Sequence, residues 1–141
     1  SLIEKALAVF IEKNVVKLLV VLRKRDTKSL ELLIDEIIDV FFDFFVAKQG
    51  LRKELFRNAS EELLSNIYAA EDHIQKEIKQ SLLFYRPKSS DDEVEMISYI
   101  MVQSVVGCLR GSFSENRKID FPKLKKELTL IIKSYLKHKE F

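Results

Sequence analysis

The stretch EIIDVFFDFFVAKQGLRKELF, residues 36–56, places four phenylalanines in five consecutive positions and turns polar around Gly50. At about 100° per residue, these rings continue one broad apolar face of a helix that begins before them. A face this wide predicts a helix that packs against several neighbours. Its rings either fill a dense core or line a cavity for an apolar ligand, and the pattern is consistent with both. The face comprises Leu30, Leu33, Ile34, Ile37, Ile38, Phe41, Phe44 and Phe45.

The opposite side of this helix carries Asp35, Asp39 and Asp43, one turn apart. Three like charges on one face would be costly if they were buried without partners. We therefore expect these carboxylates to be solvated rather than catalytic.

Helix-forming runs fill the rest of the chain, which has only three glycines and two prolines. They predict an all-α, single-domain bundle of about six helices over residues 1–141. The expected helices span roughly residues 2–22, 27–48, 51–58, 60–85, 90–111 and 122–138. Gly50 ends the second helix and Pro122 lies near the first turn of the sixth. The expected N-caps are Asp26 or Thr27, Ser60, and Ser89 or Ser90.

Composition limits the class of protein. Apolar residues make up 47% and charged residues 33%, and the net charge of +2 is too small to predict a nucleic-acid surface. The single cysteine, Cys108, fits a reducing compartment. No apolar run reaches the ~18 residues of a membrane span and no signal peptide is visible, so we expect a cytoplasmic protein with no membrane partner. Because the first residue is Ser1 and not methionine, we also expect a missing neighbouring domain.

No motif indicates catalysis: glycine-rich phosphate loops, G-x-S-x-G and Cys/His clusters are all absent from the sequence. We expect neither an enzyme nor a cofactor. His73 and Glu77 are spaced i, i+4, but two residues are too few for a metal site. They form a surface ion pair or, with Asn66, the polar rim of an apolar cavity. The stripe beside them is Leu63, Ile67, Ala70, Ile74 and Ile78.

The last two expected helices are apolar on more than one side. In the fifth, Ile100, Ser104, Gly107 and Gly111 form a strip of mostly small residues, away from a face made of Val94, Met101, Val105, Cys108 and Leu109. A glycine inside a helix costs about 1 kcal/mol against alanine and usually has a packing reason. These helices predict half of a four-helix homodimer interface, and the alternative is a monomer that buries both faces. The sixth helix contributes Leu124, Leu128, Ile131, Ile132 and Tyr135.

The order of segments resembles the C-terminal regulatory domain of TetR-family transcriptional repressors. The resemblance rests on ELLIDEIIDVFFDFFVAKQGLRKELFRNAS, the long helix after it, the break at YRPKSSDDE, and MISYIMVQSVVGCLRGSF followed by IDFPKLKKELTLIIKSYLK. The family's N-terminal helix-turn-helix is not in this sequence, so DNA binding is implied only through a missing domain. The resemblance implies a connector in the first helix, a cavity among the first, second and fourth helices, and a dimer through the last two.

On this basis we expect a small apolar or amphipathic ligand to shift the helices and control DNA binding. The competing interpretation is a protein-interaction or lipid-binding module without a role on DNA. The expected ligand site is Phe10, Phe41, Phe44, Phe45, Asn66, Ile67, Tyr68, His73 and Tyr99. The expected dimer interface is Ile100, Ser104, Gly107, Gly111, Leu124, Leu128, Ile131 and Tyr135.

Overall fold

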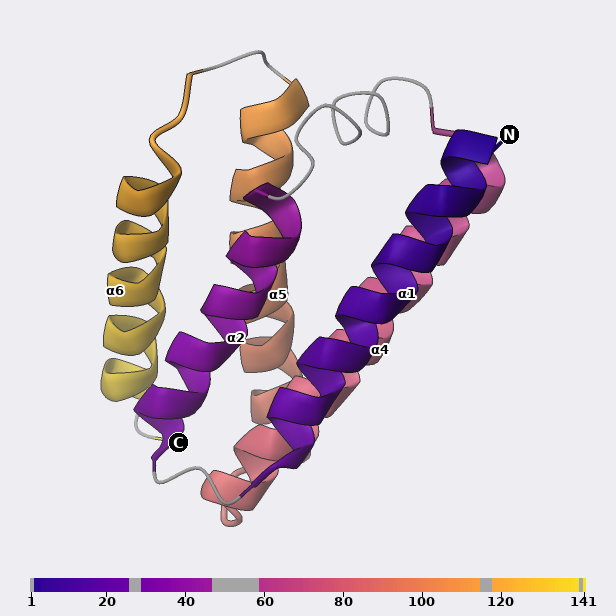
Figure 1. Cartoon of the computed structure of the whole chain (residues 1–141). Helices are drawn as coiled ribbons and strands as arrows, with labels where there is room; N and C mark the ends of the chain where they lie inside the picture. Colours follow the sequence, from indigo (N-terminus) through magenta and orange to yellow (C-terminus); the bar gives the residue numbers. More distant parts are fainter. Residues whose placement is uncertain (1, 26–28, 47–58, 115–117, 140) are drawn as a thin grey trace.

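The computed structural model describes residues 2–25, 29–46, 59–114, 118–139 and 141. These residues form an all-helical bundle, which confirms the predicted fold class. The predicted helix at 51–58, the proposed caps Asp26 and Thr27, and the stop at Gly50 lie outside the described residues. The helices are α1 (Leu2–Arg23), α2 (Leu30–Val46), α4 (Glu61–Tyr85), α5 (Asp91–Ser114) and α6 (Phe121–Lys139) (Figure 1).

Short polar side chains cap the N-termini of four of these helices. Ser29, Ser60, Ser90 and Asp120 each accept a hydrogen bond from the backbone N–H three residues further on, at 3.1–3.2 Å. Each of these bonds satisfies a donor that the first turn of a helix leaves unpaired. The predicted caps Ser60 and Ser90 are therefore confirmed, whereas α2 begins at a cap, Ser29, that the sequence pattern had not indicated.

The helices pack so that α1 lies along α4 and α2 lies between α1 and α6, with α5 against α4 (Figure 1). Apolar side chains from all five helices meet in one main core. A smaller cluster around Leu7 and Leu63 joins the N-terminal ends of α1 and α4. The long helices α1 and α4 are also tied together at both ends. Glu4 accepts hydrogen bonds from Ser60, and Arg23 pairs with Glu77 at 2.7 Å.

Helix α2 buries a wider arc than its sequence pattern predicts. The expected face is buried from Leu30 to Phe41, but Phe42 is also buried, with only 3% of its surface exposed. The reason is that α2 contacts α1 on one side and α6 on the other, so side chains on both flanks are covered. The Phe45 side chain lies outside the described part of the chain.

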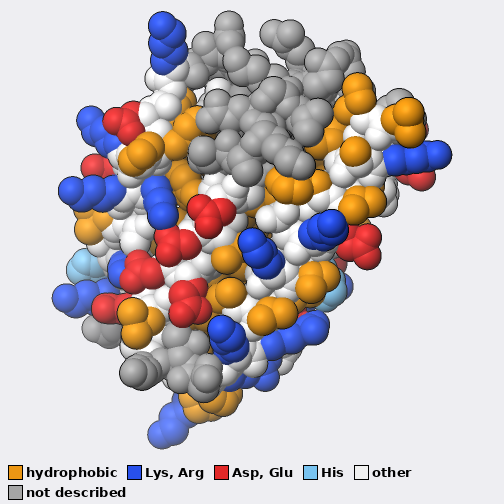
Figure 2. Space-filling view, viewed as in Figure 1, with side chains coloured by type: hydrophobic (Ala, Val, Ile, Leu, Met, Phe, Trp, Pro, Cys, Tyr) orange, Lys and Arg blue, Asp and Glu red, His pale blue; other side chains and the backbone are white. Residues whose placement is uncertain are grey.

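The acidic residues of α2 are not simply solvated, as we had expected. Asp35 pairs with Lys133 of α6 at 2.9 Å, and Asp39 pairs with Lys125 at 2.5 Å. Acidic and basic side chains accordingly lie together over α2 and α6 in Figure 2. Both carboxylates remain about half exposed, so each pair adds at most about 1 kcal/mol to stability. Both pairs join α2 to α6, which also pack together through the main core.

No helix among the described residues is both long enough and apolar enough to cross a membrane.

Candidate functional site

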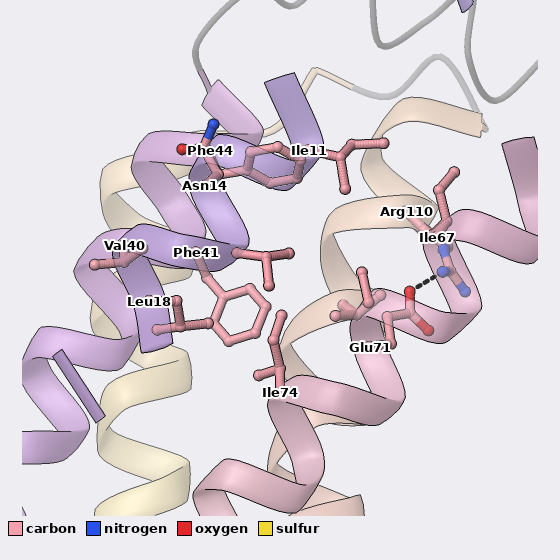
Figure 3. A pocket seen from close by; sticks show the side chains of 13 residues that line it. Ile11, Asn14, Leu18, Val40, Phe41, Phe44, Ile67, Glu71, Ile74 and Arg110 are labelled. Atoms are coloured by element: carbon pink, nitrogen blue, oxygen red, sulfur yellow. Dashed lines mark hydrogen bonds and ion pairs between the residues drawn. The ribbon is translucent and has the colours of Figure 1, made fainter. Parts of the chain in front are cut away.

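A pocket of about 60 Å³ lies among α1, α2, α4 and α5 (Figure 3). Each helix contributes residues one turn apart, which places their side chains on the same face. Nearly all of the lining is apolar. The lining residues are Ile11, Asn14, Val15 and Leu18 of α1, Val40, Phe41 and Phe44 of α2, Ile67, Ala70, Glu71 and Ile74 of α4, and Val106 and Arg110 of α5.

Two phenylalanines of α2 line the pocket on the side opposite Glu71 and Arg110 (Figure 3). Phe41 is buried, and Phe44 is partly buried and stacks on Phe10 of α1 with ring centroids 5.3 Å apart. Rigid rings on helices that do not cross closely leave space between them, whereas flexible aliphatic chains would fill it. The aromatic cluster therefore contributes both to the core and to a cavity.

One ion pair lies in the pocket lining. Arg110 of α5 donates a hydrogen bond to Oε1 of Glu71 on α4, and its guanidinium also lies 5.5 Å from the ring centroid of Tyr68. Burial of the Glu71 carboxylate raises its pKa, and the neighbouring Arg110 charge offsets this effect only in part. The Glu71 carboxylate thus lies where a negative charge is unfavourable unless a neighbouring positive charge compensates it.

Asn14 is the other polar residue in the lining. Its Nδ2 donates a hydrogen bond to the backbone carbonyl of Phe10, one turn earlier in α1, at 2.8 Å. This bond orients the side-chain amide and uses only its donor end. The Oδ1 atom keeps its capacity to accept a hydrogen bond.

Of the expected ligand-site residues, Phe41, Phe44 and Ile67 line the pocket. Phe10 lies beside it through its stack on Phe44. Tyr68 is more than half exposed and does not line the pocket, but its ring lies beside Arg110, which does.

Asn66, His73 and Tyr99 are placed outside the pocket, which corrects their expected role as its polar contacts. Asn66 and His73 are exposed on α4, each one position before a residue that faces inward, and one position turns a side chain by about 100°. Tyr99 is 51% exposed on the outer side of α5. Glu77 pairs with Arg23 of α1, and this hydrogen bond is the main reason why its pKa is lowered.

Asn14, Glu71 and Arg110 are the polar lining residues that sequence reasoning missed. Helical spacing offered a signal for two of them, because Glu71 lies one turn after Ile67 and Arg110 lies one turn after Val106. Their pairing connects residues 39 positions apart on different helices, so no local pattern indicates it.

The expected dimer residues of α5 lie on the outer surface or partly covered. A Cβ atom added at Gly107 or at Gly111 would meet nothing within 4 Å, and Ile100 and Ser104 are half-buried. The fold of one chain therefore does not explain the glycines. Cys108 is also exposed, which corrects its expected place on the buried face.

The expected interface residues of α6 differ in burial. Ile131 is 57% exposed, whereas Leu128 belongs to the core and cannot meet a partner. The reason is that Leu128, Ile132 and Leu136, spaced by four residues, form the stripe that packs against the bundle. Leu124 and Tyr135 are partly buried against the same core.

Among the described residues, no group of three or more His, Cys, Asp or Glu side chains is arranged to hold a metal ion. The chain matches the model of the tetracyclin repressor-like C-terminal domain family over residues 29–136. Because this match covers most of the sequence, the chain belongs to that family. Comparisons with curated proteins and with solved structures give no match.

Proposed function

We propose that this chain is the ligand-sensing and dimerisation domain of a cytoplasmic transcriptional repressor, in which an N-terminal domain outside this sequence binds DNA. The observation that carries the proposal is the apolar pocket bounded by four helices of a tetracyclin repressor-like domain. An apolar space with few polar groups is the usual form of a small-molecule site. Gly107 and Gly111 of α5, where an added Cβ atom would meet nothing within 4 Å, support dimerisation.

The ion pairs suggest how a ligand in the pocket changes the domain. Bonds at both ends of α1 join it to α4, so these two helices form one unit. By contrast, α1 meets α2 at the pocket through apolar side chains, including the Phe10–Phe44 stack. A ligand that favours a wider pocket therefore moves the α1–α4 unit relative to α2. Such a population shift moves the first helix, which is the connector to the DNA-binding domain.

Dimerisation in this proposal uses the outer faces of α5 and α6. Large apolar side chains on these helices are more than half exposed, namely Met96, Tyr99, Leu130 and Ile131. Beside them, Gly107 and Gly111 leave room for the backbone of a second helix to approach. A two-fold pairing of this surface would cover the apolar side chains of both copies.

Thermal unfolding in the presence of small apolar and amphipathic compounds tests the sensing role, because a ligand that binds only the folded state raises the melting temperature. The matched variants are Ala70→Leu, which places a larger side chain in the pocket, and Ala69→Leu on the exposed face of the same helix. We expect Ala70→Leu to reduce the ligand-induced shift and Ala69→Leu to preserve it. Equal shifts in both variants would place binding elsewhere and would favour a helical interaction module.

A test of the proposed role on DNA needs the complete protein that contains this chain. We expect it to bind an operator as a dimer and to release it when a pocket ligand is added. Operator binding that does not respond to a ligand that stabilises the domain would contradict the proposed mechanism.

A further inference from the structure

The two charged side chains of the pocket lining, Glu71 and Arg110, differ in how much of their surface is exposed. The Glu71 side chain is 14% exposed, whereas Arg110 is 29% exposed and extends toward Tyr68. Arg110 uses Nη2 for its bond to Glu71, and that bond occupies only Oε1 of the carboxylate. Among the described residues, no hydrogen bond reaches Oε2. The more buried member of the pair is thus an acceptor with unused capacity.

Apart from Arg110, the other polar and aromatic groups of the pocket lining also favour a positive charge. Asn14 has its donor bound to the Phe10 carbonyl and its Oδ1 acceptor unused by any described residue. The rings of Phe41 and Phe44 lie on the opposite side of the space from Glu71 (Figure 3). Aromatic faces attract cations, and more strongly where water is excluded. The lining therefore combines one carboxylate that has unused acceptor capacity with two aromatic rings in an otherwise aliphatic space, and the Asn14 amide lies at its edge (Figure 3).

We propose that the pocket binds a hydrophobic organic ammonium ion, whose charged group pairs with Glu71 and whose hydrocarbon part lies against Phe41 and Phe44. This inference rests on the proposed sensing function and names the ligand class of that site. The volume of about 60 Å³ holds roughly four to six waters. The fitting hydrocarbon is a single ring or a short chain rather than a multi-ring compound.

An apolar carboxylate fits the same groups less well. To reach Arg110 from the pocket, it would have to lie beside the Glu71 carboxylate, and like charges at such distances repel each other. Burial already raises the pKa of Glu71, so a further negative charge would add to an existing cost. A bound cation has the opposite effect, because it supplies the compensation that Arg110 provides only in part.

A matched series tests the charge requirement. Isothermal titration with benzylammonium, benzyl alcohol and phenylacetate compares one hydrocarbon, the benzyl group, with a positive, a neutral and a negative end. We expect the ammonium to bind at least about tenfold more tightly than the other two, as a hydrogen-bonded charge pair implies. Equal or tighter binding of the alcohol or the carboxylate would overturn the ligand class and leave the pocket as a binding site. Binding by none of the three would overturn both the ligand class and the proposed sensing role.

Substitutions distinguish the role of Glu71 in binding the ammonium from its structural pairing with Arg110. Glu71→Gln should remove the preference for the ammonium while the alcohol still binds. Glu77→Gln is the control, because Glu77 is in the same helix, is similarly buried at 17% exposure and also pairs with an arginine, yet lies outside the pocket. Arg110→Gln should preserve or strengthen ammonium binding. Loss of ammonium binding in a folded Arg110→Gln protein, or an unchanged preference in Glu71→Gln, would contradict the proposal.

Discussion

Phe10 of α1 stacks on Phe44 of α2, with ring centroids 5.3 Å apart and an interplanar angle of 25°. The stack joins α1, the helix expected to transmit a signal, to α2, one of the four helices that line the pocket. Because Phe44 is itself a lining residue, a ligand that displaces its ring also changes the contact with α1. The stack therefore couples α1 to the pocket in addition to the four α1 residues that line it directly.

We expect Phe10→Ala to lower the free energy of unfolding, because the stack contributes about 0.5–1.5 kcal/mol beyond the apolar area that it buries. The control is Phe84→Ala. Phe84 is about half exposed on α4, and its ring contacts Tyr85, the next residue in the chain. Urea unfolding of the two variants measures the difference. Similar losses for both would show that the stack adds nothing to the joining of α1 and α2.

Phe42→Ala should cost about 3–5 kcal/mol, because it would empty a site in the core. Leu32→Ala, on the exposed side of the same helix, should cost far less. Chemical denaturation measures both. A small loss for Phe42→Ala would mean that α2 does not bury its second flank in solution.

Gly107→Leu should weaken the proposed dimer, since its side chain would occupy the space in which a partner helix approaches. Ala69→Leu, at an exposed position of α4, is the control, because it also adds bulk to a helix surface but outside the proposed interface. Light scattering at micromolar concentration checks the mass. A mass of 16.5 kDa for the unmodified chain would exclude the dimer outright.

Replacing Gly107 with alanine should stabilise the single chain even if it weakens the dimer. Alanine at this position meets no neighbour and improves helix propensity by about 1 kcal/mol. If Gly107→Ala raises the melting temperature while the mass of the protein falls, the glycine serves the interface and not the fold. A higher melting temperature with no change in assembly would contradict the proposed interface.

The two glutamates of α4 should respond to pH with opposite signs. Burial raises the folded-state pKa of Glu71 above 4.5, so the folded state binds more protons there and this group's contribution to stability declines as pH rises above 4.5. The hydrogen bond from Arg23 lowers the pKa of Glu77, so its contribution is present above 4.5 and is lost as pH falls through the folded value.

Unfolding of the two glutamine variants across pH 3 to 7 measures these signs. Relative to the unmodified chain, Glu71→Gln should gain stability as pH rises above 4.5, and Glu77→Gln should lose stability as pH rises toward 4.5. Parallel curves for the two variants would show that their ion pairs are equivalent.

The helical fold could be read from the sequence because its determinants are local. Side chains such as Ser60 and Ser90 start helices through bonds three residues away, and the apolar face of α2 repeats within single turns. Apolar periodicity also placed Phe41, Phe44 and Ile67 on apolar helix faces, the family resemblance implied a cavity there, and all three line the pocket. Each of these features depends on residues that are neighbours in the chain, and the sequence by itself therefore determined them.

The identity of the polar pocket residues was decided only by the tertiary structure. Glu71 meets Arg110 because α4 and α5 pack together, and Arg23 takes Glu77 as its partner because α1 lies along α4. The burial of Phe42 and Leu128 likewise follows from which helix covers each flank. A helical period shows that two side chains share a face, but the neighbour of that face depends on how the helices cross. The angle at which two helices cross depends on the packing of the whole core rather than on any one segment.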